Sequence, residues 1–281
     1  MKIISFFLRL ILFAFLTITT QVGGVIYLIY KPLGLFISKK INTKWKVIGA
    51  KIATFLLVYL AFTLLIIPPI AKHFGRVQLP FSASKDIPLQ ARNICFCLLN
   101  RTYVKPKLKE AIIRTANELL KNEAYKGTLI TYLDSGFPFF EGFPLLPHLS
   151  HDDGEKIDIA LFYNDAKTQK RINSSPSFMG YGVSEEPRAG ERNRPEECAE
   201  QGYSLYSFMR NHLVSQAEKS NFAFDEAATA AYLRILAEDK SIGKILLEPH
   251  LKQRLGLSEI DKIRLHGCQA VRHDDHIHIQ L

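Results

Sequence analysis

Side chains that can bind a metal are concentrated in two short segments of this chain. The candidates are His148, His151, Asp158, His273, His276 and His278. Five of the nine histidines in 281 residues fall in these segments, which indicates one shared site. The remaining histidines are assigned to structural or surface roles: His73, His212, His250 and His266.

A strand would place two of these histidines on one face. Successive side chains of a β-strand point to opposite faces, so His276 and His278 project together from the terminal sequence HIHIQL. Asp158 occupies the polar position of a second alternating run, residues 157–162. Zinc binds imidazole and carboxylate groups in tetrahedral geometry, and catalytic sites use three protein ligands so that water keeps the fourth position. The two segments therefore predict a catalytic zinc site.

Hydrophobic periodicity predicts the elements around these segments. Helices are expected at about 107–122, 222–237 and 250–255, and strands at 128–133, 157–162, 244–248 and 276–281. The segment 173–202 is rich in Ser, Pro, Gly and charge, which predicts a long surface insertion that can serve as a flap. The aromatic loop from Gly136 to Phe140 is interpreted as a core plug, with a substrate-groove wall as the alternative.

The positive charge is confined to the N-terminal part of the chain. Residues 1–80 contain ten Lys or Arg and no Asp or Glu, so the other residues hold 26 basic and 27 acidic side chains. The formal charge of +9 thus becomes −1 when the first 80 residues are left out. A nucleic-acid partner would need a basic face on the folded domain, so nucleic acid is excluded as the expected partner.

Two apolar segments, residues 10–30 and 52–71, are each long enough to cross a membrane as a helix. A signal peptide is less favoured for the first, because no small-residue cleavage site stands out and a second span follows. The Lys-rich segment 31–51 between them is predicted to be cytoplasmic by the positive-inside rule. Both ends would then face outward, which requires the charged N-terminus to cross the membrane.

The chain is therefore expected to have two parts. Residues 1–79 would anchor it in the inner membrane, and residues 80–281 would form one domain in the periplasm. The pair Pro68-Pro69 is expected to end the second helix, and a short linker is expected to run from there to Pro88.

The cysteines fit an oxidising compartment. The sequence contains Cys95, Cys97, Cys198 and Cys268, which allow three pairings, and one or two disulfides are expected. A metal-binding role for Cys95 and Cys97 is disfavoured, because a C-x-C pair without a second pair nearby is a weak signal.

The spacing of the metal-binding candidates resembles that of a known family. The pattern H-x2-H-x6-D at 148–158, followed by H-x2-H-x-H at 273–278, is similar to the penicillin-insensitive murein endopeptidases. These belong to the LAS zinc peptidases, named for lysostaphin, the D-Ala-D-Ala metallopeptidases and hedgehog. The resemblance implies an α+β fold, with a small antiparallel sheet and flanking helices that carry the zinc site.

The resemblance also implies residue roles. Zinc would be bound by His151, Asp158 and His278, and His276 would act as the catalytic base. The two other histidines of the pattern are His148 and His273. They would stabilise developing negative charge or orient a ligand, and the resemblance does not assign which histidine has which role.

Two acidic pairs adjoin the histidines. Asp152-Asp153 and Asp274-Asp275 are interpreted as solvated turn residues, with a role in orienting histidines as the alternative.

The function expected from the resemblance is hydrolysis of an amide bond in the stem or crosslink peptides of peptidoglycan. A D-Ala-D-Ala carboxypeptidase or a peptidase for another envelope peptide is the alternative within the same class. A non-enzymatic zinc-containing binding or signalling domain is the alternative from another class. The presence of His276 and His273 beside the expected ligands favours catalysis, because a binding module needs only the metal ligands.

Overall fold

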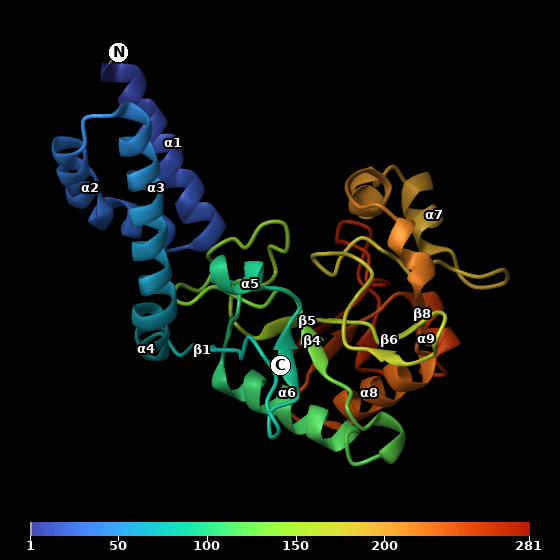
Figure 1. Ribbon diagram of the computed structural model, residues 1–281. Coiled ribbons are helices and arrows are strands. Elements are labelled where there is room, and N and C mark those ends of the chain that lie inside the picture. The colour runs from blue at the N-terminus through green and yellow to red at the C-terminus, as the bar shows by residue number, and fades with distance from the viewer. Residues whose placement is uncertain (1) are drawn as a thin grey trace.

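The computed structural model of the protein describes residues 2–281 and has a mixed α+β fold (Figure 1). Its α-helices are α1 (Lys2–Thr20), α2 (Gly23–Lys40), α3 (Lys44–Ala61), α4 (Ile67–His73), α5 (Ile94–Leu98), α6 (Pro106–Leu119), α7 (Arg194–Glu200), α8 (Glu226–Glu238) and α9 (Pro249–Arg254). The strands are β1 (Val77–Gln78), β2 (Leu89–Ala91), β3 (Tyr103–Val104), β4 (Ile130–Tyr132), β5 (Lys156–Ala160), β6 (Tyr163–Asp165), β7 (Arg171–Ile172), β8 (Phe222–Phe224), β9 (Lys244–Leu246), β10 (Ile263–Arg264) and β11 (His276–Gln280).

The N-terminal helices form an antiparallel bundle in which the expected first span is divided. Residues 10–30 do not form one helix, because α1 ends at Thr20 and α2 begins at Gly23. Gln21 lies between them with φ 65°, in the left-handed region that reverses the chain. A Cβ atom on Gly24 would lie 2.0 Å from the Thr17 hydroxyl, so glycine is required where α2 folds back onto α1.

The segment expected to be a cytoplasmic loop, residues 31–51, is mostly helical. It comprises the second half of α2, a turn at 41–43 and the first part of α3. By length and composition, two helical stretches can cross a membrane: Ile3–Thr20, near the N-terminus where a signal sequence meets the same criteria, and Lys44–His73.

The second stretch does not end at Pro68-Pro69, contrary to the expectation. A π-helical turn at Phe62–Ile66 connects α3 to α4, and the helix continues to His73. Both prolines lie in the first turn of α4, where the missing backbone N–H groups break the regular hydrogen-bond pattern without ending the helix.

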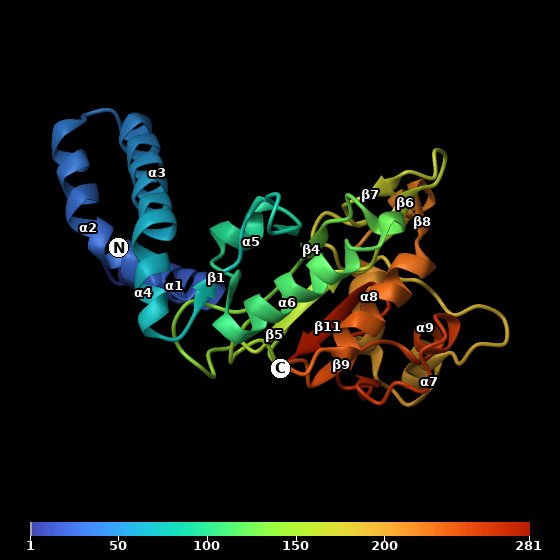
Figure 2. The ribbon, with the colours of Figure 1, turned by 90° about the horizontal axis from the view of Figure 1, so that it is seen from below.

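A six-stranded sheet forms the centre of the C-terminal domain, in the order β10-β9-β11-β5-β4-β2. The pairs from β9 to β4 are antiparallel, whereas the edge strands β10 and β2 pair in parallel, so the sheet is not purely antiparallel. The apolar side chains of β5 and β11 pack with α6 and α8, which lie together across one face of the sheet (Figure 2). Because side chains alternate, Asp158 and His278 point to the other face, and the register places them opposite each other.

A second, three-stranded sheet has the order β7-β6-β8. Its strand β8 occupies residues 222–224, which were expected to begin a helix; the helix α8 starts only at Glu226. Asp225 explains the boundary, because its side chain accepts a hydrogen bond from the Ala228 backbone N–H and caps the helix.

The bundle and the domain are in direct contact. The Tyr59 hydroxyl of α3 donates to the Leu98 carbonyl at 2.6 Å and accepts from the Asn100 side-chain amide at 3.0 Å. At the turn between α1 and α2, Gln21 accepts a hydrogen bond from the Phe139 backbone N–H at 2.8 Å. The expected linker is therefore not a free connection, since β1 pairs with β3 and Leu79 is buried in the domain core.

Candidate metal centre

Three side chains converge on the face of the central sheet opposite α6 and α8. Asp158 comes from β5, His278 from the neighbouring β11, and His151 from the loop before β5. His278 Nδ1 lies 2.9 Å from Asp158 Oδ1, and His151 Nε2 lies 3.2 Å from both of these atoms. All three residues are buried, with 4% of their surface or less exposed. This group can hold a metal ion.

The hydrogen bonds around His151 test whether the group suits a cation. A backbone carbonyl can only accept, so the contact of 2.8 Å between His151 Nδ1 and the Ser135 carbonyl places the proton on Nδ1. Burial opposes a charged His151, but the Asp158 carboxylate raises the pKa of His151, and in the charged form Nε2 donates to Asp158 Oδ1 at 3.2 Å. In the neutral form the Nε2 lone pair faces the carboxylate, and the two can share a cation. In a tetrahedral site with bonds of about 2.0 Å, donor atoms lie about 3.3 Å apart, so the donor set fits zinc.

Asp275 orients His276 toward the three candidate metal ligands. Its Nδ1 atom pairs with the Asp275 carboxylate, and its Nε2 atom lies 3.8 Å from Asp158 Oδ1. Burial opposes the charged imidazole, but the Asp158 and Asp275 carboxylates raise the pKa of His276 to about 9. The environment thus stabilises an imidazolium at this position.

His148 is fixed by a second carboxylate, which sequence analysis missed. Its Nδ1 atom lies 2.8 Å from Asp134 Oδ2, and the Arg101 guanidinium binds Asp134 with a closest distance of 2.6 Å. Asp134 and His148 are both buried. Arg101 thus orients His148 through Asp134, from a segment that precedes the metal-binding pattern by more than forty residues.

Tyr181 connects these groups and was also missed. Its hydroxyl donates to Asp158 Oδ2 at 2.8 Å and accepts from the Asp134 backbone N–H at 3.0 Å. Its ring packs between His148 and His276, with centroid distances of 4.5 and 4.9 Å. Tyr181 lies in the segment expected to be a surface insertion. That expectation was wrong for Gly180–Glu185, which are all buried beside the site.

His273 lies at the edge of the cluster. Its ring is 5.0 Å from that of His276 and 5.7 Å from that of His278, and it stacks on His266. Burial, together with the neighbouring His276 and His278, holds the pKa of His273 well below its ordinary value. His273 is therefore neutral at physiological pH.

The two acidic pairs behave differently. Asp153 accepts from the Glu155 backbone N–H and is partly exposed, as expected of a turn residue. The turn interpretation was wrong for Asp274 and Asp275, which are buried. Asp274 pairs with the Arg272 guanidinium, whereas Asp275 binds His276 and the Gly182 backbone N–H.

A cleft of about 460 Å³ opens onto the cluster. Its lining combines apolar side chains of the segment 205–209 with polar side chains of the sheet. The lining includes Leu205, Phe208, Met209, Lys156, Lys244 and Gln280. A cleft of this volume is in the range of small-molecule and peptide sites.

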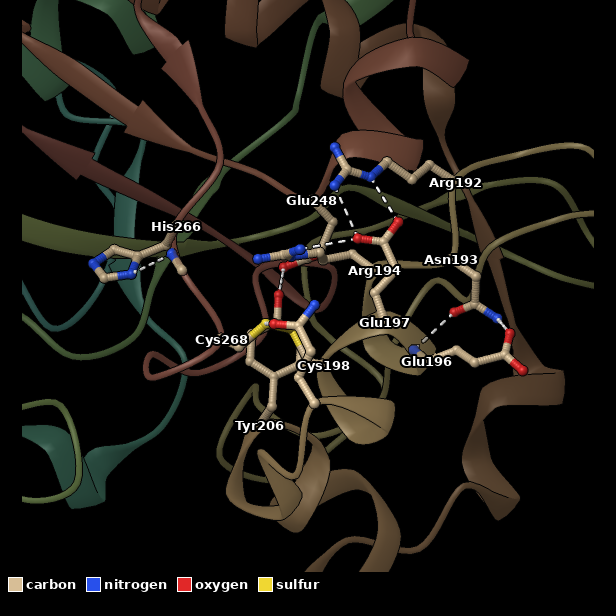
Figure 3. The surroundings of a disulfide bond; sticks show 12 residues. Arg192, Asn193, Arg194, Glu196, Glu197, Cys198, Tyr206, Glu248, His266 and Cys268 are labelled. Carbon is tan, nitrogen blue, oxygen red and sulfur yellow. Dashed lines mark hydrogen bonds and ion pairs between the residues drawn. A yellow bond between two sulfur atoms is a disulfide. The ribbon is translucent and has the colours of Figure 1, made fainter.

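A disulfide joins the segment that carries α7 to the loop before β11 (Figure 3). It links Cys198 to Cys268, so one of the expected bridges is present, whereas Cys95 and Cys97 are free. Beside it, the Tyr206 hydroxyl donates to Glu248, whose carboxylate also accepts from the His273 backbone N–H at 3.2 Å. These contacts connect the wall of the cleft to the histidine cluster.

Sequence comparison adds no relatives to this description: no family model matches the chain, and no curated protein matches it.

Proposed function

We propose that this protein is a membrane-anchored zinc peptidase of the LAS type, which hydrolyses an amide bond in a peptidoglycan stem or crosslink peptide. The observation that carries the proposal is the convergence of His151, Asp158 and His278 at donor distances of 2.9 to 3.2 Å, with His276 aimed at the same centre. A metal-binding module alone would need no buried Asp–His pair beside the ligands.

The residues have separable tasks in the proposed reaction. A zinc ion bound by the three ligands would polarise the scissile carbonyl and acidify a water molecule. A bound cation would offset the Asp158 charge that helps to raise the pKa of His276 to about 9, so that neutral His276 could accept a proton from the attacking water at Nε2 and deliver it to the departing amine. Asp275 would hold Nδ1 and stabilise the imidazolium formed in between. His148, oriented by Asp134, would stabilise negative charge on the carbonyl oxygen.

The proposed location follows from the shape of the bundle. Large apolar side chains are exposed along α1, α2 and α3, as expected for a lipid-facing surface. The start of α1 and the Lys-rich turn from α2 to α3 lie at the same end of the bundle (Figure 1). With that end in the cytoplasm, α1 and the stretch Lys44–His73 would cross the inner membrane outward, and α2, which is less apolar and does not meet the same criteria, would return between them. The domain would then lie in the periplasm, and no charged N-terminus would have to cross.

Digestion of purified peptidoglycan by the full chain in nanodiscs, read out by mass spectrometry of the released muropeptides, tests the proposed activity. Cleavage of one amide bond type is expected, with loss of activity on the order of 10³-fold or more in Asp158→Ala and His276→Ala. His73→Ala is the control, because His73 is exposed at the end of α4. An inactive, metal-loaded wild-type chain would refute the peptidase and favour a binding module.

The same digest separates the alternatives within the peptidase class. Release of free D-Ala would identify a carboxypeptidase, whereas separation of two crosslinked stems would identify an endopeptidase.

A further inference from the structure

Three basic side chains line one open cavity between the helices of the bundle, where Arg9 and Lys31 are exposed and Lys51 is partly buried. The cavity has a volume of about 380 Å³ and lies between α1, α2 and α3. Arg9 of α1, Lys31 of α2 and Lys51 of α3 line it. The rest of its lining is mainly apolar or aromatic and includes Leu12, Leu16, Tyr27, Tyr30, Ile52 and Phe55. An adjoining cavity of about 300 Å³ shares Arg9, Tyr27 and Lys31 and is otherwise lined by Phe6, Leu10, Phe13 and Leu28.

The three cations lie at a similar depth. Arg9 is seven residues from Lys2, Lys51 is seven residues from Lys44, and Lys31 is nine residues from the end of α2. At 1.5 Å per helical residue, each lies about 10 to 14 Å from the basic end of the bundle. If the basic end lies at the outer edge of the headgroup layer, which is about 5 to 7 Å thick on each side, the three cations reach the outer part of a hydrocarbon core that is about 30 Å thick.

Within residues 2–281, no carboxylate is paired with these three cations. The sequence contains no Asp or Glu before Asp86. Among the described residues, none of the three side chains forms an ion pair with a carboxylate. Unpaired cations near a membrane interior are costly, so a basic pocket between helices favours an anion.

From this arrangement we infer a binding site for an anionic phospholipid. The phosphate of the headgroup would contact Arg9, Lys31 and Lys51, and an acyl chain would lie along the apolar lining of the two cavities. Gly34 lets the Tyr30 ring of the cavity wall pack against α2, since a Cβ atom there would lie 3.0 Å from the Tyr30 hydroxyl. The inference rests on the proposed membrane location and is independent of the peptidase activity.

Native mass spectrometry of the full chain in detergent tests the site, with titrations of phosphatidylglycerol and phosphatidylcholine. The pocket variant carries Arg9→Gln, Lys31→Gln and Lys51→Gln. The matched control carries Lys39→Gln, Lys44→Gln and Lys46→Gln, which removes the same charge from residues that do not line the cavity. A separate arm adds excess inorganic phosphate.

The wild type and the control are expected to bind phosphatidylglycerol in preference to phosphatidylcholine. The pocket variant is expected to lose affinity for phosphatidylglycerol on the order of 100-fold, at about 1 kcal/mol for each basic residue. Equal affinity of the pocket and control variants, or equal binding of both lipids by the wild type, would overturn the site. Displacement of the lipid by inorganic phosphate would assign the pocket to free phosphate instead. Circular dichroism verifies that both variants are folded.

Discussion

Asp275 determines, at the scale of single residues, how His276 can act. It binds His276 Nδ1 and thereby directs Nε2 toward the metal ligands. For Asp275→Asn we expect kcat/KM on muropeptides to fall about 10- to 100-fold, with unchanged zinc content, because an orienting carboxylate is lost while the ligands remain. Asp261→Asn, on an exposed turn, is the control. A large loss of bound zinc in Asp275→Asn would contradict a role confined to His276.

Glu248 makes the stability of the fold depend on pH. Burial and the neighbouring Asp274 raise the pKa of Glu248 from 4.5 to about 7. Between these pH values the folded chain keeps a proton that the unfolded chain releases. The free energy of unfolding therefore falls as the pH rises through this window and stays lower above it.

Replacing Glu248 by Gln should remove this dependence. Between pH 4.5 and pH 7 the free energy of unfolding of the wild type is expected to fall by on the order of 3 kcal/mol more than that of Glu248→Gln. Chemical denaturation at several pH values measures the difference, with the exposed Glu259→Gln as the reference. If the free energies of unfolding of the wild type and Glu248→Gln changed in parallel with pH, the Glu248 carboxyl would not titrate in the expected range.

At the scale of elements, the close approach of α1 and α2 depends on Gly24. A Cβ atom at this position would collide with the Thr17 hydroxyl at 2.0 Å and with the Phe13 backbone carbonyl oxygen at 2.9 Å. Gly24→Ala should therefore destabilise the bundle by about 1 to 3 kcal/mol. Gly49→Ala on α3 is the matched control, because no atom lies within 4 Å of its Cβ position. Thermal unfolding in detergent should separate the two variants, and equal melting temperatures would contradict the tight hairpin.

The disulfide stabilises the segment that forms one wall of the cleft. It closes a loop with a sequence separation of 70, so its removal should lower the free energy of unfolding by about 2 to 5 kcal/mol. Cys268→Ser is expected to show this loss, and reducing agent should not lower its melting temperature further. The melting temperature of Cys95→Ser should fall on reduction as that of the wild type does. If reduction leaves the melting temperature of the wild type unchanged, the bridge does not stabilise the fold.

Local pattern predicted the elements that carry the site but not all of its residues. Alternating hydrophobicity correctly identified the strands at β5 and β11, because their two faces meet different surroundings. Asp134 and Tyr181 were missed because their partners are distant in sequence. Arg101 precedes Asp134 by 33 residues, and Asp158 precedes Tyr181 by 23 residues. The division of the first apolar segment was missed because average hydropathy does not register a turn at Gln21.

At the scale of the whole molecule, the packed interface holds the C-terminal domain in a fixed position against the helical bundle. The contacts of Tyr59 with Leu98 and of Gln21 with Phe139 leave no flexible tether between the two parts. Reporter fusions test the proposed orientation. A reporter after Leu281 should be active in the periplasm, and one in the turn at 41–43 should be active in the cytoplasm. The reverse pattern would remove peptidoglycan as the substrate.

Elemental analysis of the purified full chain tests the central proposal most directly. We predict one zinc ion per wild-type chain, and loss of that ion in His278→Ala but not in His212→Ala, whose side chain lies in the exposed turn at Met209–Leu213. A folded wild-type chain without a stoichiometric metal, or one whose metal survives the loss of His278, would contradict the account.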